Sequence, residues 1–456
     1  MLYDNEYLEW RGFLLRLKDQ VTIKIESIAF GGHGVGRIEN FVVFVPFAAP
    51  DDELDVEIVE LKKKFARGRI VNISRPSPLR VVPLCGRYEN CGGCCYQHLS
   101  YEQQLKIKKK QVYDAFLKIG KFVSPPVLEP IASPQAYHYR GKAQLHAANE
   151  TSEWKLGFLD VSGGKIVDID RCEIMEETIN DKIKELRDNT KLLSVESNLT
   201  IWSGLQDDIS QNTDRGYGTP KQALGKDYAA ICRGSIPSAE LDCSTYQFRS
   251  IADDLQVTAL SELEFHNQIK RMVKGKKFLV PDGGFFQANL YLTDRLVDEV
   301  CRLAMPVKIN TLVDAYCGSG LFSIFLSPYA QNVFGIETDE QAVKFAKMNA
   351  ENQGVRNTKF ICGKVESVLT REFASGADSI DLLLLDPPRS GCDGAVLKAI
   401  STLRPQKVIY ISCNPATQAR DIKYLRECGY DLLSLLPLDM FAQTEHIEVI
   451  GYLTLR

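Results

Sequence analysis

Two hydrophobic patterns divide the chain. Between residues 21 and 73, apolar and polar positions alternate with a period of two in several short runs, and a glycine-rich turn at 31–36 separates two of them. Short strands at this spacing predict a small closed β-barrel. From about Gly283 short apolar runs alternate with helical patterns, which is typical of a doubly wound parallel sheet. We therefore expect an all-β module early in the chain and an α/β module late in it.

The region between these modules is less regular. Residues 137–175 alternate again and predict an antiparallel middle domain, whereas residues 204–240 are polar and rich in Gly, Asp and Ser, which indicates a loop or insertion. Ser100 and Gln103 form a capping box at the start of an amphipathic helix. We expect a leader or frayed helix (1–19), a barrel (20–82), a central domain (83–282) and an α/β domain (283–456).

In the α/β domain the apolar runs predict buried strands at 311–315, 332–337, 358–362, 382–385 and 408–412. A helix over 339–352, capped by Asp339, should connect the second and third of them. Ligands of open α/β sheets bind at the carboxyl ends of the strands. The residues that follow each strand are therefore the candidates for chemistry.

The last of these strands ends at a thiol. Residues 408–411 are apolar and lead directly into Ser412, Cys413, Asn414 and Pro415. A cysteine at the carboxyl end of a buried strand could act as a nucleophile, although most free cysteines are simply small buried apolar residues.

The first of these strands ends in a glycine-containing turn, Asp314-Ala-Tyr316-Cys-Gly318-Ser-Gly320, that would let a ligand approach the start of a helix. Glu337 ends the next strand, where an acidic side chain can bind ribose hydroxyls. The third glycine of a dinucleotide-binding motif is absent, so an adenosyl ligand without phosphates is favoured over a pyrophosphate. This pattern indicates S-adenosylmethionine (AdoMet).

A leucine run leads into Asp386-Pro-Pro-Arg389. The two prolines fix the backbone and hold the aspartate at the edge of the sheet. Amino-methyltransferases of nucleic acids carry a similar motif, but an aromatic residue follows the prolines there, whereas Arg389 follows them here. The alternative interpretation is a rigid exit from the strand.

Thirteen cysteines in a long chain without a recognisable leader argue for thiol chemistry or metal binding rather than disulfides. Cys85, Cys91 and Cys94 have the spacing C-x5-C-x2-C, and the intervening glycines let the three sulfurs converge. Cys172 is the best candidate for a fourth ligand, whereas Cys95 should point away. A site of four cysteines holds zinc or an iron–sulfur cluster, and the spacing does not decide between them. Either metal is expected to be structural.

The distribution of charge along the chain indicates a binding partner. The net charge is −4, but residues 61–121 contain fourteen Lys or Arg against three acidic residues, an excess of eleven positive charges. Such a block favours nucleic-acid binding over a merely solvated face, and beside an OB-like barrel it favours RNA. No apolar run approaches membrane-spanning length and the first twenty residues carry four acids, so we expect a cytoplasmic protein, without membrane association, that is monomeric.

The order of the motifs resembles that of the RNA 5-methyluridine methyltransferases. The motifs are Phe285-Phe-Gln287-Ala-Asn289, Asp314-x-Tyr316-Cys-Gly318, Asp386-Pro-Pro-Arg389, Ser412-Cys413-Asn-Pro415 and His446-Ile-Glu448. The barrel resembles a TRAM domain. With the cysteine spacing included, the chain is similar from about Val21 onward to the TRAM-bearing, cluster-containing enzymes that modify 23S ribosomal RNA.

This resemblance implies three parts: an OB-like TRAM barrel, a central α+β iron–sulfur domain and a C-terminal Rossmann-like AdoMet-dependent methyltransferase domain. It implies a [4Fe–4S] cluster rather than zinc on the four cysteines, the nucleophile at Cys413, the general base at Glu448 and a catalytic role for Asp386. The implied AdoMet contacts are Gln287, Tyr316, Gly318, Gly320, Glu337 and Asp386. Leu321 and Lys364 depart from the family pattern, which affects the adenosyl contacts and not the chemistry.

The implied chemistry needs both a nucleophile and a base. Carbon-5 of uracil is a poor nucleophile until the Cys413 thiolate adds to carbon-6, and Glu448 then removes the carbon-5 proton so that the cysteine can leave. The uracil must leave its stack to reach the site. Three alternatives remain: the same chemistry on the T-loop uridine of transfer RNA, exocyclic-amine methylation through the Asp386 segment, and a non-enzymatic iron–sulfur RNA-binding protein.

Overall fold

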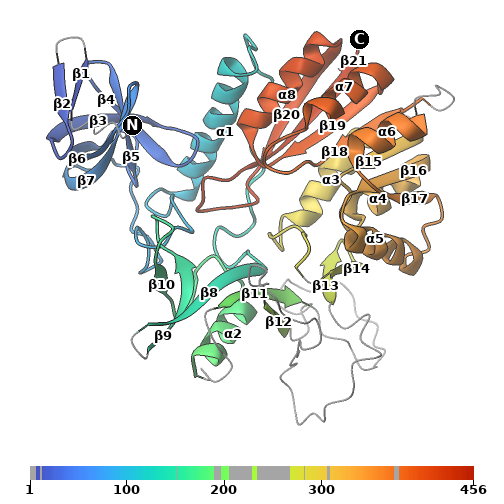
Figure 1. The fold of residues 1–456 in the computed structure, drawn as a ribbon, viewed down its shortest axis with the longest axis horizontal. Coiled ribbons are helices and arrows are strands. Elements are labelled where there is room, and N and C mark those ends of the chain that lie inside the picture. Colours follow the sequence, from blue (N-terminus) through green and yellow to red (C-terminus); the bar gives the residue numbers. More distant parts are fainter. Residues whose placement is uncertain are drawn as a thin grey trace, which may run out of the picture.

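The three larger β-structures of the described residues follow one another along the chain: a closed barrel, a five-stranded sheet and a seven-stranded sheet (Figure 1). The computed structural model of the protein describes residues 7–10, 13–150, 153–188, 197–204, 228–233, 268–281, 283–305, 309–373 and 379–456. None of the helices in these ranges is long and apolar enough to cross a membrane.

The predicted barrel is confirmed. Its strands are β3 (Gln20–Ile28), β4 (His33–Ile38), β5 (Phe41–Pro46), β6 (Glu53–Leu61) and β7 (Phe65–Arg75), and a short parallel pairing of β5 with β7 closes it. Alternate residues such as Val43 and Val45 are fully buried inside, as the period of two requires. In the segment expected to be a leader, β1 (Tyr7–Trp10) and β2 (Phe13–Arg16) form an antiparallel hairpin.

The central part contains an antiparallel sheet, as predicted. Its strands, in spatial order, are β10 (Ile166–Asp168), β9 (Glu153–Leu159), β8 (Lys142–Glu150), β11 (Ser197–Gly204) and β12 (Tyr228–Arg233), with α2 (Glu177–Asp188) beside them. β12 lies within the predicted insertion 204–240, whose residues 205–227 and 234–240 lie outside the described residues. The hairpin of β13 (Gln268–Val273) and β14 (Lys276–Pro281) follows.

One long helix, α1 (Tyr101–Lys118), connects the barrel to the rest of the molecule. The Ser100 side chain accepts a hydrogen bond from the amide of Gln103, which confirms the predicted cap. Figure 1 shows α1 lying between the barrel and the seven-stranded sheet, where it packs against α8 and β20. This position matters for the site described below.

The seven-stranded sheet confirms the predicted α/β module. Its spatial order is β17 (Thr358–Cys362), β16 (Ala330–Glu337), β15 (Ile309–Ala315), β18 (Leu382–Leu385), β19 (Lys407–Ser412), β21 (Glu448–Leu455) and β20 (Tyr430–Leu438). The helices are α3 (Thr293–Ala304), α4 (Leu321–Leu326), α5 (Glu340–Asn352), α6 (Val365–Phe373), α7 (Gly394–Leu403) and α8 (Pro415–Glu427), with a 3-10 turn η3 (Ser327–Tyr329). The predicted strands are parallel, and β21 is the first antiparallel one.

Both faces of this sheet are buried. Leu382 and Leu384 on β18 belong to the core on the side of α3, α4 and α5, whereas Leu383 and Leu385 belong to the core on the side of α6, α7 and α8. All four side chains are fully buried. A strand covered on both faces needs a continuous apolar run, which explains the leucine run in the sequence.

Gly68 tests how tightly the barrel is packed. A Cβ atom added at Gly68 would lie 2.1 Å from Cγ1 of Val56, a fully buried side chain. We therefore expect Gly68→Ala to destabilise the protein by about 1–3 kcal/mol through overpacking. The urea midpoint, followed by circular dichroism, measures this loss. Gly394→Ala is the control, because an added Cβ there meets nothing within 4 Å; equal midpoints for the two variants would contradict the expectation.

Candidate active site

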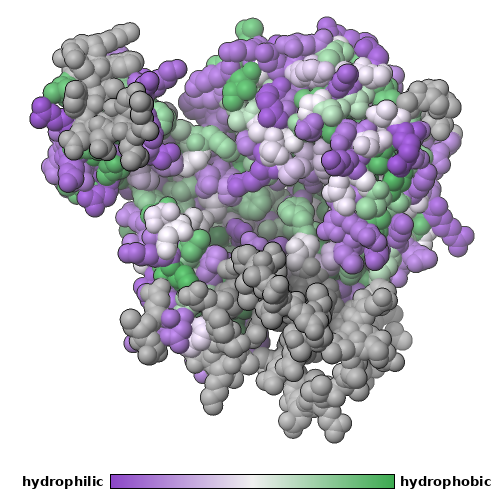
Figure 2. Space-filling model, viewed as in Figure 1, coloured by the Kyte–Doolittle hydropathy of each residue, from purple (hydrophilic) through white to green (hydrophobic). Residues whose placement is uncertain are grey.

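Three neighbouring strands bring Asp386, Cys413 and Glu448 to one edge of the sheet. Cys413 directly follows β19, and Asp386 directly follows β18, its parallel neighbour. β21 runs antiparallel to β19 with Ser412 opposite Val449, so the next position along each strand sets Cys413 against Glu448. The carboxyl ends of the parallel strands point toward a hollow between the barrel and the two sheets, and apolar residues gather on its floor (Figures 1 and 2).

The pKa values of these groups show that they influence one another. The pKa of the Cys413 thiol is raised to about 11, chiefly by burial and then by Glu448, whereas the Arg389 guanidinium lowers it. Burial, followed by the nearby Asp386, holds the pKa of Glu448 well above its usual range. Burial and then Asp314 raise the pKa of Asp386 to about 7. A carboxylate with a raised pKa is a stronger proton acceptor, which suits a general base.

Arg389 is a functional residue that the sequence argument named without assigning it a role. Its backbone carbonyl accepts hydrogen bonds from the side-chain amide of Asn414 and the hydroxyl of Thr417, each at 3.2 Å. Its guanidinium donates to the ring of His446 and lies close enough to Cys413 to favour the thiolate. Burial lowers the pKa of His446 to about 4, so the neutral ring can accept this hydrogen bond. The position of Arg389 directly after the Asp-Pro-Pro segment is the sequence feature from which a role for this residue could have been predicted.

The loop after Arg389 is fixed on α8 by a buried carboxylate. Asp421 is fully buried and accepts hydrogen bonds from the amide of Cys392 at 2.9 Å and from the hydroxyl of Tyr410 at 2.7 Å. Arg420 donates to the carbonyl of Ser390 at 3.0 Å. Since α8 begins two residues after Cys413, Cys413 and the arginine loop are both supported by this helix.

The turn after β15 has the form expected for AdoMet. Glu337 accepts a hydrogen bond from the amide of Gly318 at 3.1 Å, which joins the ends of β15 and β16. A Cβ atom added at Gly318 would meet nothing within 4 Å, so this turn borders open space that a ligand can enter. Gly320 has a φ of +87° and caps α4, a conformation that favours glycine. Tyr316 donates its amide to the carbonyl of Ile336 at 2.8 Å.

Polar atoms in the same turn have unused bonding capacity. Among the described side chains, Asp314 Oδ1 and Ser319 Oγ are buried without a hydrogen-bond partner. Unpaired buried polar atoms are costly, so they fit a turn that receives a polar ligand. Leu321, one of the two departures from the family pattern, is buried in the core and therefore serves packing. Lys364, the other departure, is exposed directly before α6.

Gln287 lies in a buried segment that reaches the same region. The side-chain amide of Asn289 donates to the carbonyl of Met440 at 3.2 Å, and Met440 lies in the connection between β20 and β21. Gln287 itself is 4% exposed, and its carbonyl accepts a hydrogen bond from Arg271 at 3.4 Å. The predicted AdoMet contacts thus come from several segments around the carboxyl edge of the sheet.

The four predicted metal-binding cysteines lie within electrostatic reach of one another but do not form a metal site. The pKa of Cys172 is raised to about 12, chiefly by burial and in part by the thiols of Cys91 and Cys85. These thiols therefore lie within electrostatic reach of Cys172. Burial, followed by Cys172, likewise raises the pKa of Cys94. Across the described ranges, however, no three or more His, Cys, Asp or Glu side chains are arranged to hold a metal ion. The donor set suits a cluster, but the thiols are not in coordinating positions.

Many basic residues of the block 61–121 are paired with acids, several of which (Glu53, Glu57, Glu60, Glu129 and Asp439) lie outside it. Its exposed arginines on β7 bind glutamates on β6, as in the pairs Arg67–Glu60, Arg69–Glu57 and Arg75–Glu53. Lysines of α1 pair with Glu102, Asp114, Glu129 and Asp439. The block is therefore less positive than its sequence indicated. The exposed Lys63 and Lys64, at the turn between β6 and β7, are the better candidates for RNA contacts.

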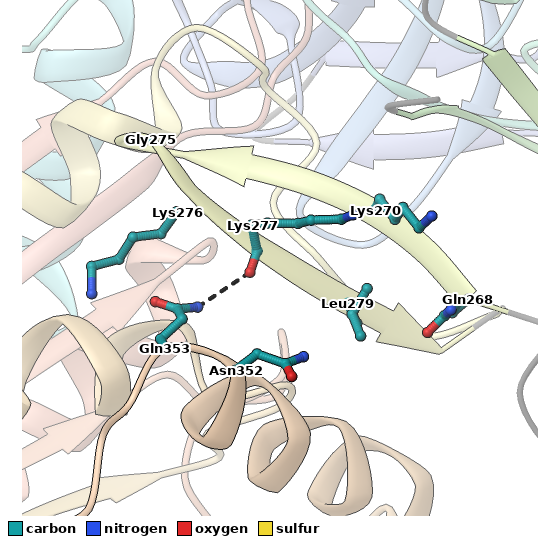
Figure 3. A pocket seen from close by; sticks show the side chains of 8 residues that line it. All are labelled: Gln268, Lys270, Gly275, Lys276, Lys277, Leu279, Asn352 and Gln353. Carbon is teal, nitrogen blue, oxygen red and sulfur yellow. Dashed lines mark hydrogen bonds between the residues drawn. The ribbon is translucent and has the colours of Figure 1, made fainter. Parts of the chain in front are cut away.

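A pocket of about 640 Å³ lies between the β13–β14 hairpin and the end of α5 (Figure 3). Lys270, Lys276 and Lys277 line it, and Gln353 donates to the carbonyl of Lys277 at 3.2 Å. None of the predicted site residues lines this pocket. It is therefore separate from the candidate active site.

Comparisons with known proteins identify the family of this chain. Residues 261–456 match the family model described as tRNA (Uracil-5-)-methyltransferase, and residues 19–71 match the TRAM domain. Proteins described as uncharacterized RNA methyltransferases from Halalkalibacterium halodurans and Staphylococcus aureus are each 32% identical to this chain. Each alignment covers 96% of this chain, and 97% and 98% of the respective relative.

A solved structure is similar over nearly the whole length. It is the tRNA (uracil-54, C5)-methyltransferase of Pyrococcus abyssi in complex with S-adenosyl-L-homocysteine, with a TM-score of 0.67 and 25% identity. The similarity covers 95% of this chain and 100% of the archaeal chain. The chain therefore belongs to the RNA methyltransferases that combine a TRAM domain with a tRNA (uracil-5-)-methyltransferase domain.

Proposed function

We propose that this protein transfers a methyl group from AdoMet to carbon-5 of a uridine in RNA, through a covalent adduct with Cys413. The observation that carries this proposal is the pairing of β19 with β21, which sets Cys413 against Glu448. Membership in a methyltransferase family makes the non-enzymatic alternative wrong. Exocyclic-amine methylation would leave the Cys413–Glu448 pair without a role.

The proposed reaction uses these residues in order. The Cys413 thiolate, favoured by the Arg389 guanidinium, adds to carbon-6 of the uracil. Carbon-5 of the resulting enolate then attacks the methyl group of AdoMet, and S-adenosylhomocysteine is released. Glu448 removes the proton from carbon-5. The electrons of that bond restore the double bond between carbon-5 and carbon-6, and the thiolate leaves. AdoMet supplies the electrophilic methyl sulfonium.

We assign the AdoMet contacts to the turn and strand ends at the carboxyl edge of the sheet. The ribose is proposed to bind Glu337, whose carboxylate reaches the amide of Gly318. The open space beside Gly318 supports this assignment. The complete proposed set is Gln287, Tyr316, Gly318, Gly320, Glu337 and Asp386.

Two RNA substrates are candidates for this chemistry. The TRAM barrel together with the cysteine spacing favours a uridine in 23S ribosomal RNA. The similarity to the Pyrococcus abyssi enzyme, whose described activity is on uracil-54 of transfer RNA, favours the T-loop uridine instead. Either RNA would contact the turn that carries Lys63 and Lys64, beside the edge-to-face ring pair of Phe44 and Phe65. We propose that the protein acts on one of them in the cytoplasm.

Transcripts containing 5-fluorouridine test the nucleophile and the substrate together. Fluorine at carbon-5 cannot be removed as a proton, so the methylated adduct should stay attached to the wild-type protein. We expect a denaturing gel to show a shifted band with wild type and AdoMet, and none with Cys413→Ala. The experiment uses one set of 23S fragments and one of transfer RNAs, and the set that shifts names the substrate.

The outcome against the proposal is equally clear. If wild type binds AdoMet and methylates RNA but traps neither transcript, Cys413 is not the nucleophile. Mass analysis of the modified nucleoside would then separate carbon-5 methylation from exocyclic-amine methylation.

The pH dependence should follow the Cys413 thiol. Its pKa is raised to about 11, so below that pH the reactive thiolate is the minor form and increases roughly tenfold per pH unit. We expect the rate of covalent trapping on 5-fluorouridine RNA, called the trapping rate below, to rise from pH 7 to pH 9. Arg389→Met removes the charge that opposes the raised pKa and should slow trapping at pH 8 by about tenfold. Arg371→Met, which changes an exposed side chain of α6, is the control; a flat pH profile would contradict a thiol-limited step.

We further propose that Cys85, Cys91, Cys94 and Cys172 hold a structural [4Fe–4S] cluster, supported by the mutual influence of their buried thiols. Protein prepared without oxygen should be brown and contain iron. Cys91→Ser should lose both iron and thermal stability, whereas Cys428→Ser, at the end of α8, should keep them. Metal analysis and the visible spectrum check this expectation, and stoichiometric zinc with no visible band would replace the cluster by a zinc site.

A further inference from the structure

The connection between β20 and β21, residues 439–447, leads directly into Glu448. In Figure 1 this connecting segment reaches away from the seven-stranded sheet toward the start of α1. It forms no regular helix or strand, so its shape depends on what it contacts. Its contacts include residues of α1, of the cysteine-rich loop and of the Gln287 segment.

The first contact is a buried ion pair. Lys108 on α1 and Asp439 at the start of the connecting segment are both fully buried, and their Nζ and Oδ1 atoms lie 2.5 Å apart. Lys108 also donates to the carbonyl of Phe441 at 3.1 Å. A buried charge is costly without its partner, so this pair fixes the segment relative to α1.

The second contact is a double hydrogen bond between glutamines. The side chain of Gln104 donates to the side chain of Gln443 at 2.9 Å and accepts from the amide of Gln443 at 3.0 Å. The carbonyl of Gln443 accepts from the amides of Cys95 and Tyr96, each at 3.0 Å. Gln443 has a φ of +68°, a conformation that a non-glycine residue keeps only where its surroundings impose it.

Two further bonds hold the middle of the segment. The hydroxyl of Tyr139 donates to the carbonyl of Ala442 at 2.8 Å, and Asn289 donates to the carbonyl of Met440. The barrel also reaches this place, because a Cβ atom added at Gly32 would lie 2.7 Å from the Cys95 sulfur. The segment before the proposed base is thus shaped by parts of the chain outside the seven-stranded sheet.

We propose that Lys108 and Gln104 are positioning residues that place Glu448 for proton removal from carbon-5. The proposal rests on the proposed function, because it takes Glu448 as the general base. A base must lie within hydrogen-bond reach of the proton that it removes, and a displacement of about 1 Å can cost roughly a hundredfold in rate. The same segment carries His446, the partner of Arg389.

This role predicts a defect confined to one step. Glu448 is needed only after methyl transfer, whereas trapping on 5-fluorouridine RNA needs only the nucleophile and the methyl donor. A misplaced base should therefore slow turnover and leave trapping intact. Loss of folded protein would reduce both steps in the same proportion.

The experiment compares full-length Lys108→Met and Gln104→Leu with wild type and with Glu448→Gln. We expect turnover on ordinary RNA to fall by about tenfold or more, and the trapping rate to stay within about twofold of wild type. Methylated covalent adduct should accumulate on ordinary RNA, as with Glu448→Gln. Lys182→Met, which removes a mostly buried lysine paired with Glu185 on α2, is the matched control and should leave the ratio of the two rates unchanged.

Lys108→Met leaves Asp439 buried without its partner and could therefore reduce the amount of folded protein. A second variant separates this effect from a positioning effect. Lys108→Met/Asp439→Leu removes both charges, which proteins often tolerate, and should show the same split between turnover and trapping. If both rates fall in parallel in this double variant and in Gln104→Leu, or if neither falls, the positioning role is wrong. If wild type itself forms no trapped complex, the proposed function fails before the positioning role is reached.

Discussion

The site depends on one strand pairing. β21 inserts antiparallel between β19 and β20 in a sheet whose other strands are parallel, and its register with β19 sets Glu448 against Cys413. A slip of one residue would turn every side chain of β21 to the opposite face. Both faces are buried at this point, since Val449 and Ile450 are fully buried, so such a slip is strongly disfavoured. The same packing that stabilises the sheet therefore holds Cys413 and Glu448 together.

The site also concentrates groups whose charged forms are poorly stabilised. Burial raises the pKa values of Cys413, Glu448 and Asp386; nearby carboxylates raise them further, Glu448 and Asp386 acting on Cys413, Asp386 on Glu448, and Asp314 on Asp386. Arg389 opposes the rise for both Cys413 and Glu448. Residues that follow Cys413 hold the Arg389 carbonyl, and His446 holds its guanidinium, so this favourable charge is kept in place at both ends of the residue.

Local patterns were sufficient to predict the elements that carry the site. The strand 382–385 was predicted with its observed bounds because a strand buried on both faces must be a continuous apolar run. The cap of α5 by Asp339 and the end of β19 at Ser412 are likewise encoded by adjacent residues. Such features need no knowledge of distant parts of the chain.

Contacts between distant residues could not be predicted in this way. Neither the register of β21 nor the pairing of the β6 glutamates with the β7 arginines could be predicted from local patterns. Lys108 was counted in a basic surface block, but it is fully buried against Asp439. The first nineteen residues contain a hairpin rather than a frayed helix, because strand pairing depends on a partner that periodicity alone does not reveal.

The Lys108–Asp439 pair also affects the order in which parts of the chain can pack during synthesis. These residues are 331 positions apart, so a growing chain exposes the lysine long before its carboxylate is synthesised. Until then the Lys108 side of α1 stays hydrated, because burying a lone ammonium group is too costly. The packing of α1 therefore stays incomplete until the last strands of the sheet are present. Separating the two halves of the chain would leave one unpaired charge in each. The packing of α1 and of the last strands of the sheet is therefore completed together.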